Sequence, residues 1–175
     1  MRKLSMDELA RKTAEEFRQS AKFPLVLVLD NVRSMMNTGS LFRTADAFLL
    51  QGIVLCGITA TPPHREIQKT ALGATETVYW KYYEETTEAI LDLKKQGFKI
   101  FALEQASGSM NLKDFRPEAR EHYALVFGNE VKGVDEQVLA LCDGCLEIPQ
   151  FGTKHSLNVS VTAGMVVWDF FSKMS

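Results

Sequence analysis

Long apolar runs separated by polar segments dominate the hydrophobic pattern of the chain. Residues 24–30 (PLVLVLD) contain an unbroken run of leucine and valine at 25–29, as expected of a strand buried on both faces. The same reasoning predicts further strands at residues 53–58, 98–103, 122–128 and 145–149. Because these runs lack hydrophobic–polar alternation, they indicate a parallel sheet that helices cover on both sides.

Helical spacing of apolar residues occurs around and between these runs. It predicts a short N-terminal helix at roughly residues 5–20 and two more helices at roughly residues 41–49 and 84–96. Gly52 and Gly97 then stand where helix C-caps are expected. Strands that alternate with helices predict an α/β sandwich with a parallel sheet. We expect one such domain over residues 23–175 and a helical extension over residues 1–22.

The segment 156–171 (SLNVSVTAGMVVWDFF) carries apolar side chains on almost every side of a predicted helix. A helix of this kind must be buried all round. The pattern favours burial against a second subunit, and burial in the core of a monomer is the alternative.

Composition and charge restrict the class of protein. The chain has 46% hydrophobic and 24% charged residues, and no apolar run approaches the roughly 18 residues that span a bilayer. Its first residues do not form the apolar block of a signal peptide, and its three cysteines indicate no disulfide framework, so we expect a cytoplasmic protein without a membrane span. The net charge is −2, with +2 on residues 1–22 and −4 on the remainder, so a nucleic-acid-binding face would have to be local.

Familiar nucleotide and metal motifs are absent from the sequence. There is neither a GxxxxGK[ST] phosphate loop nor a GxGxxG after the first strand, which argues against an NTPase or a Rossmann dehydrogenase. Cys142 and Cys145 have CxxC spacing without a second pair, whereas structural zinc needs four ligands. We therefore interpret them as small buried apolar residues and expect no metal site.

Two polar segments follow predicted buried strands. In the first, Asn37 is a candidate helix N-cap and Arg43 follows six residues later, which taken alone is an ordinary helix start with a solvated charge. In the second, Gly128 allows a ligand to approach the backbone and Glu130 offers acceptor oxygens, although a tight turn with a surface acid would look the same. Ligands bind at the carboxyl ends of parallel strands, so both segments are well placed for a site.

A third polar segment lies at the start of the last predicted helix. Ser156, Asn158 and Ser160 cluster there, and helix capping explains one polar residue but not three. The surplus indicates a polar site.

Taken in order, the three segments resemble the three motifs of the SpoU (TrmH-like) family of the SPOUT superfamily. The matching stretches are N-x-G-x-x-x-R from Asn37, F-G-N-E-x-x-G from Phe127, and I-P…S-L-N-V-S from Ile148; residues 69–74 (KTALGA) resemble a further family segment. The resemblance covers roughly residues 24–171. Two positions depart from the family pattern: Val131 stands where glycine is frequent, and Gln150 where methionine is frequent.

The resemblance implies an RNA ribose 2′-O-methyltransferase that uses S-adenosyl-L-methionine. It also implies a C-terminal trefoil knot, against the general rule that chains are not knotted, and a homodimer with its active site at the interface. The residues that would line the cofactor pocket are Leu103, Glu104, Gly128, Ile148 and Leu157. Those that match positions assigned to catalysis and RNA positioning are Arg43, Asn37, Glu130, Ser156 and Asn158.

The reaction is attack by a ribose 2′-oxygen on the sulfonium methyl, which requires loss of the hydroxyl proton in the transition state. A guanidinium has a pKa above about 12, so we expect Arg43 to hold the adjacent phosphate and stabilise the developing alkoxide rather than act as a base. Glu130 is a candidate to orient Arg43 through a bidentate pair. His64 and His155 are alternative bases.

Two other function classes remain open on sequence grounds. One is a catalytically silent RNA-binding module on the same fold, and the other is a small-molecule α/β enzyme unrelated to RNA. Among RNA substrates the sequence favours tRNA, with rRNA as the alternative.

Overall fold

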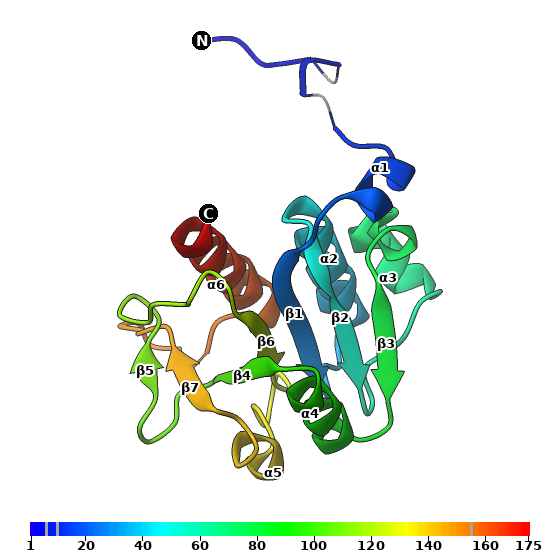
Figure 1. The fold of residues 1–175 in the computed structure, drawn as a ribbon. Coiled ribbons are helices and arrows are strands. Elements are labelled where there is room, and N and C mark those ends of the chain that lie inside the picture. Colours follow the sequence, from blue (N-terminus) through cyan, green and yellow to red (C-terminus); the bar gives the residue numbers. More distant parts are fainter. Residues whose placement is uncertain (6, 10, 155) are drawn as a thin grey trace.

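The protein is described from a computed structural model, which covers residues 1–5, 7–9, 11–154 and 156–175. Seven parallel strands form one sheet in the order β3-β2-β1-β6-β4-β7-β5 (Figure 1). The strands are β1 (Phe23–Asp30), β2 (Leu50–Cys56), β3 (Trp80–Tyr83), β4 (Phe98–Leu103), β5 (Met110–Asn111), β6 (His122–Phe127) and β7 (Gly144–Glu147). The helices are α1 (Ala14–Gln19), α2 (Met35–Ala47), α3 (Arg65–Ala71), α4 (Thr86–Lys95), α5 (Glu136–Leu139) and α6 (Val159–Met174), with 3₁₀ turns η1 (Asp7–Leu9) and η2 (Ala74–Glu76).

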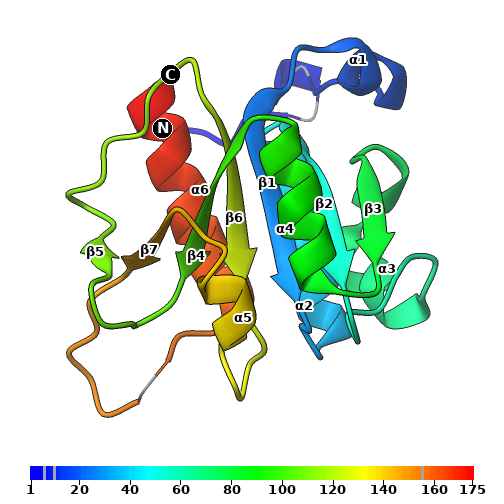
Figure 2. The same ribbon diagram turned by 60° about the horizontal axis from the view of Figure 1, so that its bottom comes forward.

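Helices cover both faces of the sheet, as the unbroken apolar strands predict. Alternate residues of β1 divide between two cores: Leu25, Leu27 and Leu29 pack in one, and Val26 and Val28 in the other. The first core includes residues of α2, α3 and α6, and the second includes residues of α4 and α5 (Figure 2). The predicted parallel-sheet α/β sandwich is therefore confirmed.

Several predicted element boundaries differ from the structure. The N-terminal helix is shorter than expected: α1 begins after Thr13, which forms a capping box with Glu16. Gly52 is not a helix C-cap, because α2 already ends at Ala47 and Gly52 lies within β2. Gly97 does follow α4 with a left-handed φ of 87°, as predicted.

The last helix, α6, is not enclosed by its own chain. Its inner face is buried in the first core, while Val161, Met165 and Trp168 on its outer face are 47%, 47% and 59% exposed. The helix is therefore not buried all round within this chain, and a stripe of large apolar side chains on its outer face is exposed.

The remaining negative expectations concern membranes, cysteines and metals. No helix in the part of the chain that the structure describes is both long and apolar enough to cross a membrane. Cys142 and Cys145 are free and half-buried, and burial raises the pKa of the Cys142 thiol to about 12. Among residues 1–5, 7–9, 11–154 and 156–175, no group of three or more His, Cys, Asp or Glu side chains is placed to hold a metal ion.

Candidate active site at the carboxyl ends of the strands

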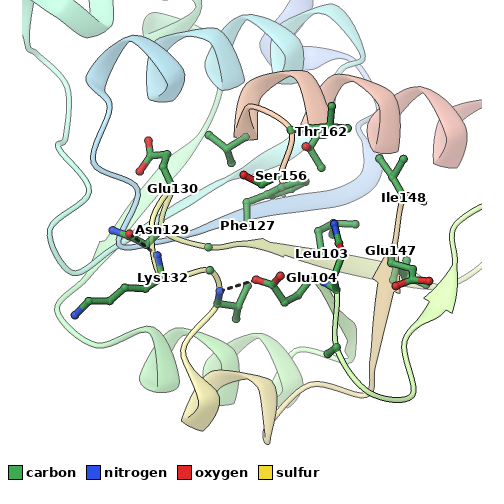
Figure 3. Close-up of a pocket in the computed structure, with 18 of the residues that line it drawn as sticks. Leu103, Glu104, Phe127, Asn129, Glu130, Lys132, Glu147, Ile148, Ser156 and Thr162 are labelled. Atoms are coloured by element: carbon green, nitrogen blue, oxygen red, sulfur yellow. Dashed lines mark hydrogen bonds between the residues drawn. The ribbon is translucent and has the colours of Figure 1, made fainter. Parts of the chain in front are cut away.

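A cavity of about 660 Å³ opens at the carboxyl ends of β4, β6 and β7 (Figure 3). These strands are neighbours in the parallel sheet, so the segments that follow them lie together at the carboxyl ends of the strands even though they are far apart in sequence. All five residues that the sequence nominated for the cofactor line the cavity: Leu103, Glu104, Gly128, Ile148 and Leu157. Three of the nominated catalytic residues line it as well: Glu130, Ser156 and Asn158.

The turn after β6 forms one wall of the cavity. Asn129 and Gly133 exchange backbone hydrogen bonds of 3.0 and 2.9 Å, and the Asn129 side chain accepts the N–H of Val131 at 2.9 Å. A Cβ on Gly128 would lie 2.2 Å from Gly133 C and from Val134 N, which are backbone atoms that cannot swing aside. Gly128 is therefore required by the close approach of two backbone segments.

Glu104 fastens this turn to the end of β4. Its carboxylate accepts the N–H of Val134 at 3.1 Å and the N–H of Gln105 at 2.9 Å. Gly133 has a φ of 73°, and a Cβ there would lie 2.2 Å from Glu104 Oε2. The Glu104 carboxylate thus links the end of β4 to the turn after β6, and the absence of a side chain at Gly133 leaves room for it.

Glu130 joins the cavity to the start of α2. Its two carboxylate oxygens accept the N–H groups of Arg33 and Ser34 at 2.9 and 3.0 Å, and Asn37 Nδ2 donates to Oε1 at 3.0 Å. Burial by itself would raise the pKa of Glu130, but these hydrogen bonds outweigh it and hold the pKa below its usual value. Asn158 Nδ2 in turn donates to Asn37 Oδ1 at 3.2 Å, so Glu130, Asn37 and Asn158 form one hydrogen-bonded chain.

One local prediction at these helix starts is wrong. Asn37 is not the N-cap of α2; Ser34 is, and its hydroxyl accepts the Asn37 N–H at 3.2 Å. Of the three polar residues at the start of α6, Asn158 is the N-cap, and its side-chain oxygen accepts the N–H of Ser160 at 2.9 Å. The amide nitrogen of Asn158 stays available for Asn37 because capping uses only the oxygen.

The predicted pairing of Glu130 with Arg43 is also wrong. In the described part of the chain, no hydrogen bond or ion pair joins them, because Glu130 is engaged by the start of α2. Arg43 is exposed and lines a second cavity of about 480 Å³ between α2, α3 and α6, together with Phe48, Lys69 and Gly164. Arg43 follows Asn37 by six residues, which corresponds to a net rotation of about 240° around α2. Its side chain therefore lies on a different face of the helix from that of Asn37.

The histidine alternatives gain no support. His64 is the N-cap of α3, and its Nδ1 accepts the N–H of Glu66 at 3.2 Å, which gives this side chain a structural role away from the cavity. His155 lies outside the described residues.

Sequence reasoning missed several polar residues that line the cavity, among them Asn129 and Thr162. Asn129 directly follows Gly128, and its position in the strand-end turn is a signal that could have identified it. Thr162 lies one helical turn after Asn158 and donates to the Asn158 carbonyl at 3.2 Å. Spacing by four residues on α6 was the only available sign.

Comparisons with known proteins agree with this geometry. The profile of the SpoU rRNA Methylase family matches residues 24–168. A tRNA (guanosine(18)-2′-O)-methyltransferase of Thermus thermophilus is 32% identical over 164 residues, which cover 93% of this chain and 81% of that protein.

Two solved structures have the same fold at comparable identity. An AdoMet-bound rRNA methyltransferase from Sinorhizobium meliloti superposes with a TM-score of 0.78 at 25% identity, over 90% of this chain but only 58% of the other. A structure described as giving insight into the 2-OH methylation of C/U34 on tRNA has a TM-score of 0.75 at 28% identity, over 86% of this chain and 95% of that one. Because the family profile matches most of the chain and a relative is 32% identical over 93% of it, the chain belongs to the SpoU methylase family.

Proposed function

We propose that the protein transfers the methyl group of S-adenosyl-L-methionine to a ribose 2′-hydroxyl of RNA. The observation that carries this proposal is that all five nominated cofactor residues line one cavity, beside the chain formed by Glu130, Asn37 and Asn158. We favour tRNA as the substrate, because a tRNA methyltransferase is similar over 93% of this chain, and keep rRNA as the alternative. These substrates agree with a cytoplasmic location.

The residues around the cavity suit the cofactor. A volume of about 660 Å³ is in the range of small-ligand sites. Leu103, Ile148 and Leu157 offer an apolar slot for an adenine ring, and Gly128 lines the same cavity. When bound, S-adenosylmethionine supplies an electrophilic methyl group on its sulfonium.

We infer that the C-terminal segment is knotted. The turn after β6 lines the cavity, as do Ile148, Gln150, Ser156, Leu157 and Asn158. Helix α6 then packs in the same core as β1 and β6 although it follows β7. A chain that passes through the loop after β6 would explain why these segments lie together. We also treat residues 1–22 as an extension to the methyltransferase domain of residues 23–175.

Arg43 and the outer face of α6 support a homodimer. Arg43 lies outside the cofactor cavity, and Gly164 of α6 lines the cavity that Arg43 occupies. Val161, Met165 and Trp168 expose a stripe of apolar surface on the same helix. We therefore propose that two copies pack through α6, and that Arg43 of one copy serves the cofactor cavity of the other.

The proposed role of Arg43 is electrostatic. The guanidinium would bind the phosphate next to the target ribose and stabilise the 2′-oxygen as its proton leaves to phosphate or water. Glu130 and Asn158 would fix the position of Asn37, whose amide is then held at the edge of the cavity. Ser156 supplies a further hydroxyl at the same edge.

Cofactor binding is tested directly by thermal unfolding. At a hundredfold excess over its Kd, S-adenosylmethionine adds about 2.7 kcal/mol to the free energy of unfolding. For a domain of this size we expect the Tm to rise by roughly 5–10 °C. S-adenosylhomocysteine, which lacks the methyl group, is the matched ligand and should also raise the Tm; no rise with either ligand would exclude the proposed cofactor.

Methyl transfer to total tRNA and to rRNA, followed by mapping of the labelled ribose, identifies the substrate. We expect label on a 2′-oxygen of tRNA. RNA binding that weakens steeply with salt, without any methyl transfer, would instead favour a silent binding module. Cofactor binding without affinity for RNA would favour a small-molecule enzyme.

The dimer is tested by placing a charge on the outer face of α6. We expect Met165→Glu to halve the molar mass measured by light scattering, because a carboxylate would be buried unpaired at the interface. Leu91→Glu is the matched control, since Leu91 on α4 is equally exposed at 47% and outside the proposed interface. A wild-type protein that is monomeric at micromolar concentration would contradict the proposed dimer.

A further inference from the structure

Asp30 is a buried acidic side chain that takes no part in the proposed chemistry. It ends β1, is 1% exposed and lines neither cavity. No ion pair of Asp30 exists within the part of the chain that the structure describes. A charge buried in this way is costly unless hydrogen bonds compensate for the lost water.

Three hydrogen bonds meet at this carboxylate, and each comes from a different place. Oδ1 accepts Asn31 Nδ2 at 2.9 Å and the Thr86 hydroxyl at 2.6 Å. Oδ2 accepts the backbone N–H of Asp135 at 3.0 Å. Since Thr86 begins α4 and Asp135 is the N-cap of α5, Asp30 connects the end of β1 to the starts of both helices.

The bond to Asp135 bears on the cavity because the wall of the cavity ends there. Residues 128–134 all line the cavity, and they are attached to the end of β1 at both ends of the turn. At the first end, Asn129 Nδ2 donates to the Asn31 carbonyl at 2.8 Å; at the second, Asp135 donates to Asp30. Glu130, which holds Asn37, lies between these two attachments.

We propose that Asp30 is a positioning residue that holds the cavity wall, residues 128–135, against the end of β1 in the geometry that binds the cofactor. The inference rests on the proposed function, since it assigns a role in cofactor binding to a residue that does not touch the cofactor. Loss of the carboxylate leaves the second attachment without its acceptor, so the wall is then held through Asn129, Glu104 and Glu130.

The first test is Asp30→Asn, which keeps the size of the side chain but replaces one acceptor oxygen with a donor. We expect the Kd and the KM for S-adenosylmethionine to rise at least about tenfold. Affinity for RNA in the absence of cofactor should stay unchanged, and unfolding should remain cooperative. A purely structural role would lower the Tm and leave the Kd for the cofactor at its wild-type value.

Asp143→Asn is the matched control. Asp143 also accepts a backbone N–H, that of Ile100 at 2.7 Å. It directly precedes β7, so it lies toward the amino ends of the strands, away from the cavity at their carboxyl ends. We expect this variant to lose stability and to keep the wild-type Kd for the cofactor.

A second pair of variants tests the same bond from the other side, and decides the matter if Asp30→Asn does not fold. Asp135 has a φ of −59°, which proline adopts without strain. Asp135→Ala removes the side chain that caps α5 but keeps the N–H, whereas Asp135→Pro removes both. We expect the proline variant to bind S-adenosylmethionine more weakly than the alanine variant.

The outcomes separate this inference from the proposed function. Equal cofactor affinity of wild type and Asp30→Asn, or of Asp135→Pro and Asp135→Ala, overturns the positioning role and leaves the proposed function intact. A wild-type protein that does not bind the cofactor overturns both.

Discussion

Arg43→Lys is expected to lower kcat for RNA methylation by about 10²–10³-fold, the usual cost of removing one preorganised donor from a transition state. Lysine keeps the positive charge but cannot reproduce the planar fork that grips a phosphate and a developing alkoxide together. The Kd for S-adenosylmethionine should not change, because the proposed partners of Arg43 are the phosphate and the 2′-oxygen of the RNA rather than the cofactor. Single-turnover methylation with saturating cofactor measures the effect.

Arg120→Lys is the matched control for this experiment. Arg120 is exposed and lies just before β6, toward the amino ends of the strands, whereas the cavity is at their carboxyl ends. We expect its activity to equal that of the wild type. If Arg43→Lys retains near-normal kcat, the proposed role of Arg43 is wrong.

Gly128→Ala is expected to abolish cofactor binding at accessible concentrations and to destabilise the fold. The added Cβ would lie 2.2 Å from the backbone of Gly133 and Val134, so the turn that forms the cavity wall must move. Overpacking of this kind costs about 1–3 kcal/mol, which for a domain of this size lowers the Tm by roughly 2–10 °C. Calorimetric titration with S-adenosylmethionine and thermal unfolding measure the two effects.

Gly152→Ala controls for the general cost of adding a methyl group. Among the described residues, apart from the two chain neighbours of Gly152, no atom lies within 4 Å of a Cβ at this position, and its φ is outside the left-handed region. Its Tm should stay close to that of the wild type. Wild-type cofactor affinity in Gly128→Ala would show that the turn is not part of the site.

The buried part of the fold was predictable, whereas its edges were not. The strand predicted at residues 98–103 coincides with β4, whose residues are apolar except for Lys99, as a strand in the middle of a parallel sheet favours. The edge strand β3 was missed since its residues, Trp80 to Tyr83, are half-buried or exposed and give no such run. Residues 53–58 were placed too late by about three positions because Leu50 and Gln51 resemble the end of the preceding helix.

The sequence identified residues of the candidate site but not the hydrogen bonds between them. Gly128 and Glu130 were identified from their place after a buried strand, and the structure brings both to the cavity. The partner of Glu130 was wrongly predicted as Arg43, because hydrogen bonds from Arg33, Ser34 and Asn37 form only when the turn after β6 folds over the start of α2.

Local pattern was sufficient for the class of fold and the parallel sheet, because burial on both faces of a strand determines which residues occur along it. The family was indicated by the resemblance of three motifs in order along the chain. Tertiary structure alone decided that Glu104 accepts the N–H of Val134 and that Asp30 accepts the N–H of Asp135. It also decided that Arg43 lies outside the cofactor cavity of its own chain. These contacts join residues up to about a hundred positions apart, and a hydrogen bond between distant residues depends on how whole strands and helices pack, which no local spacing encodes.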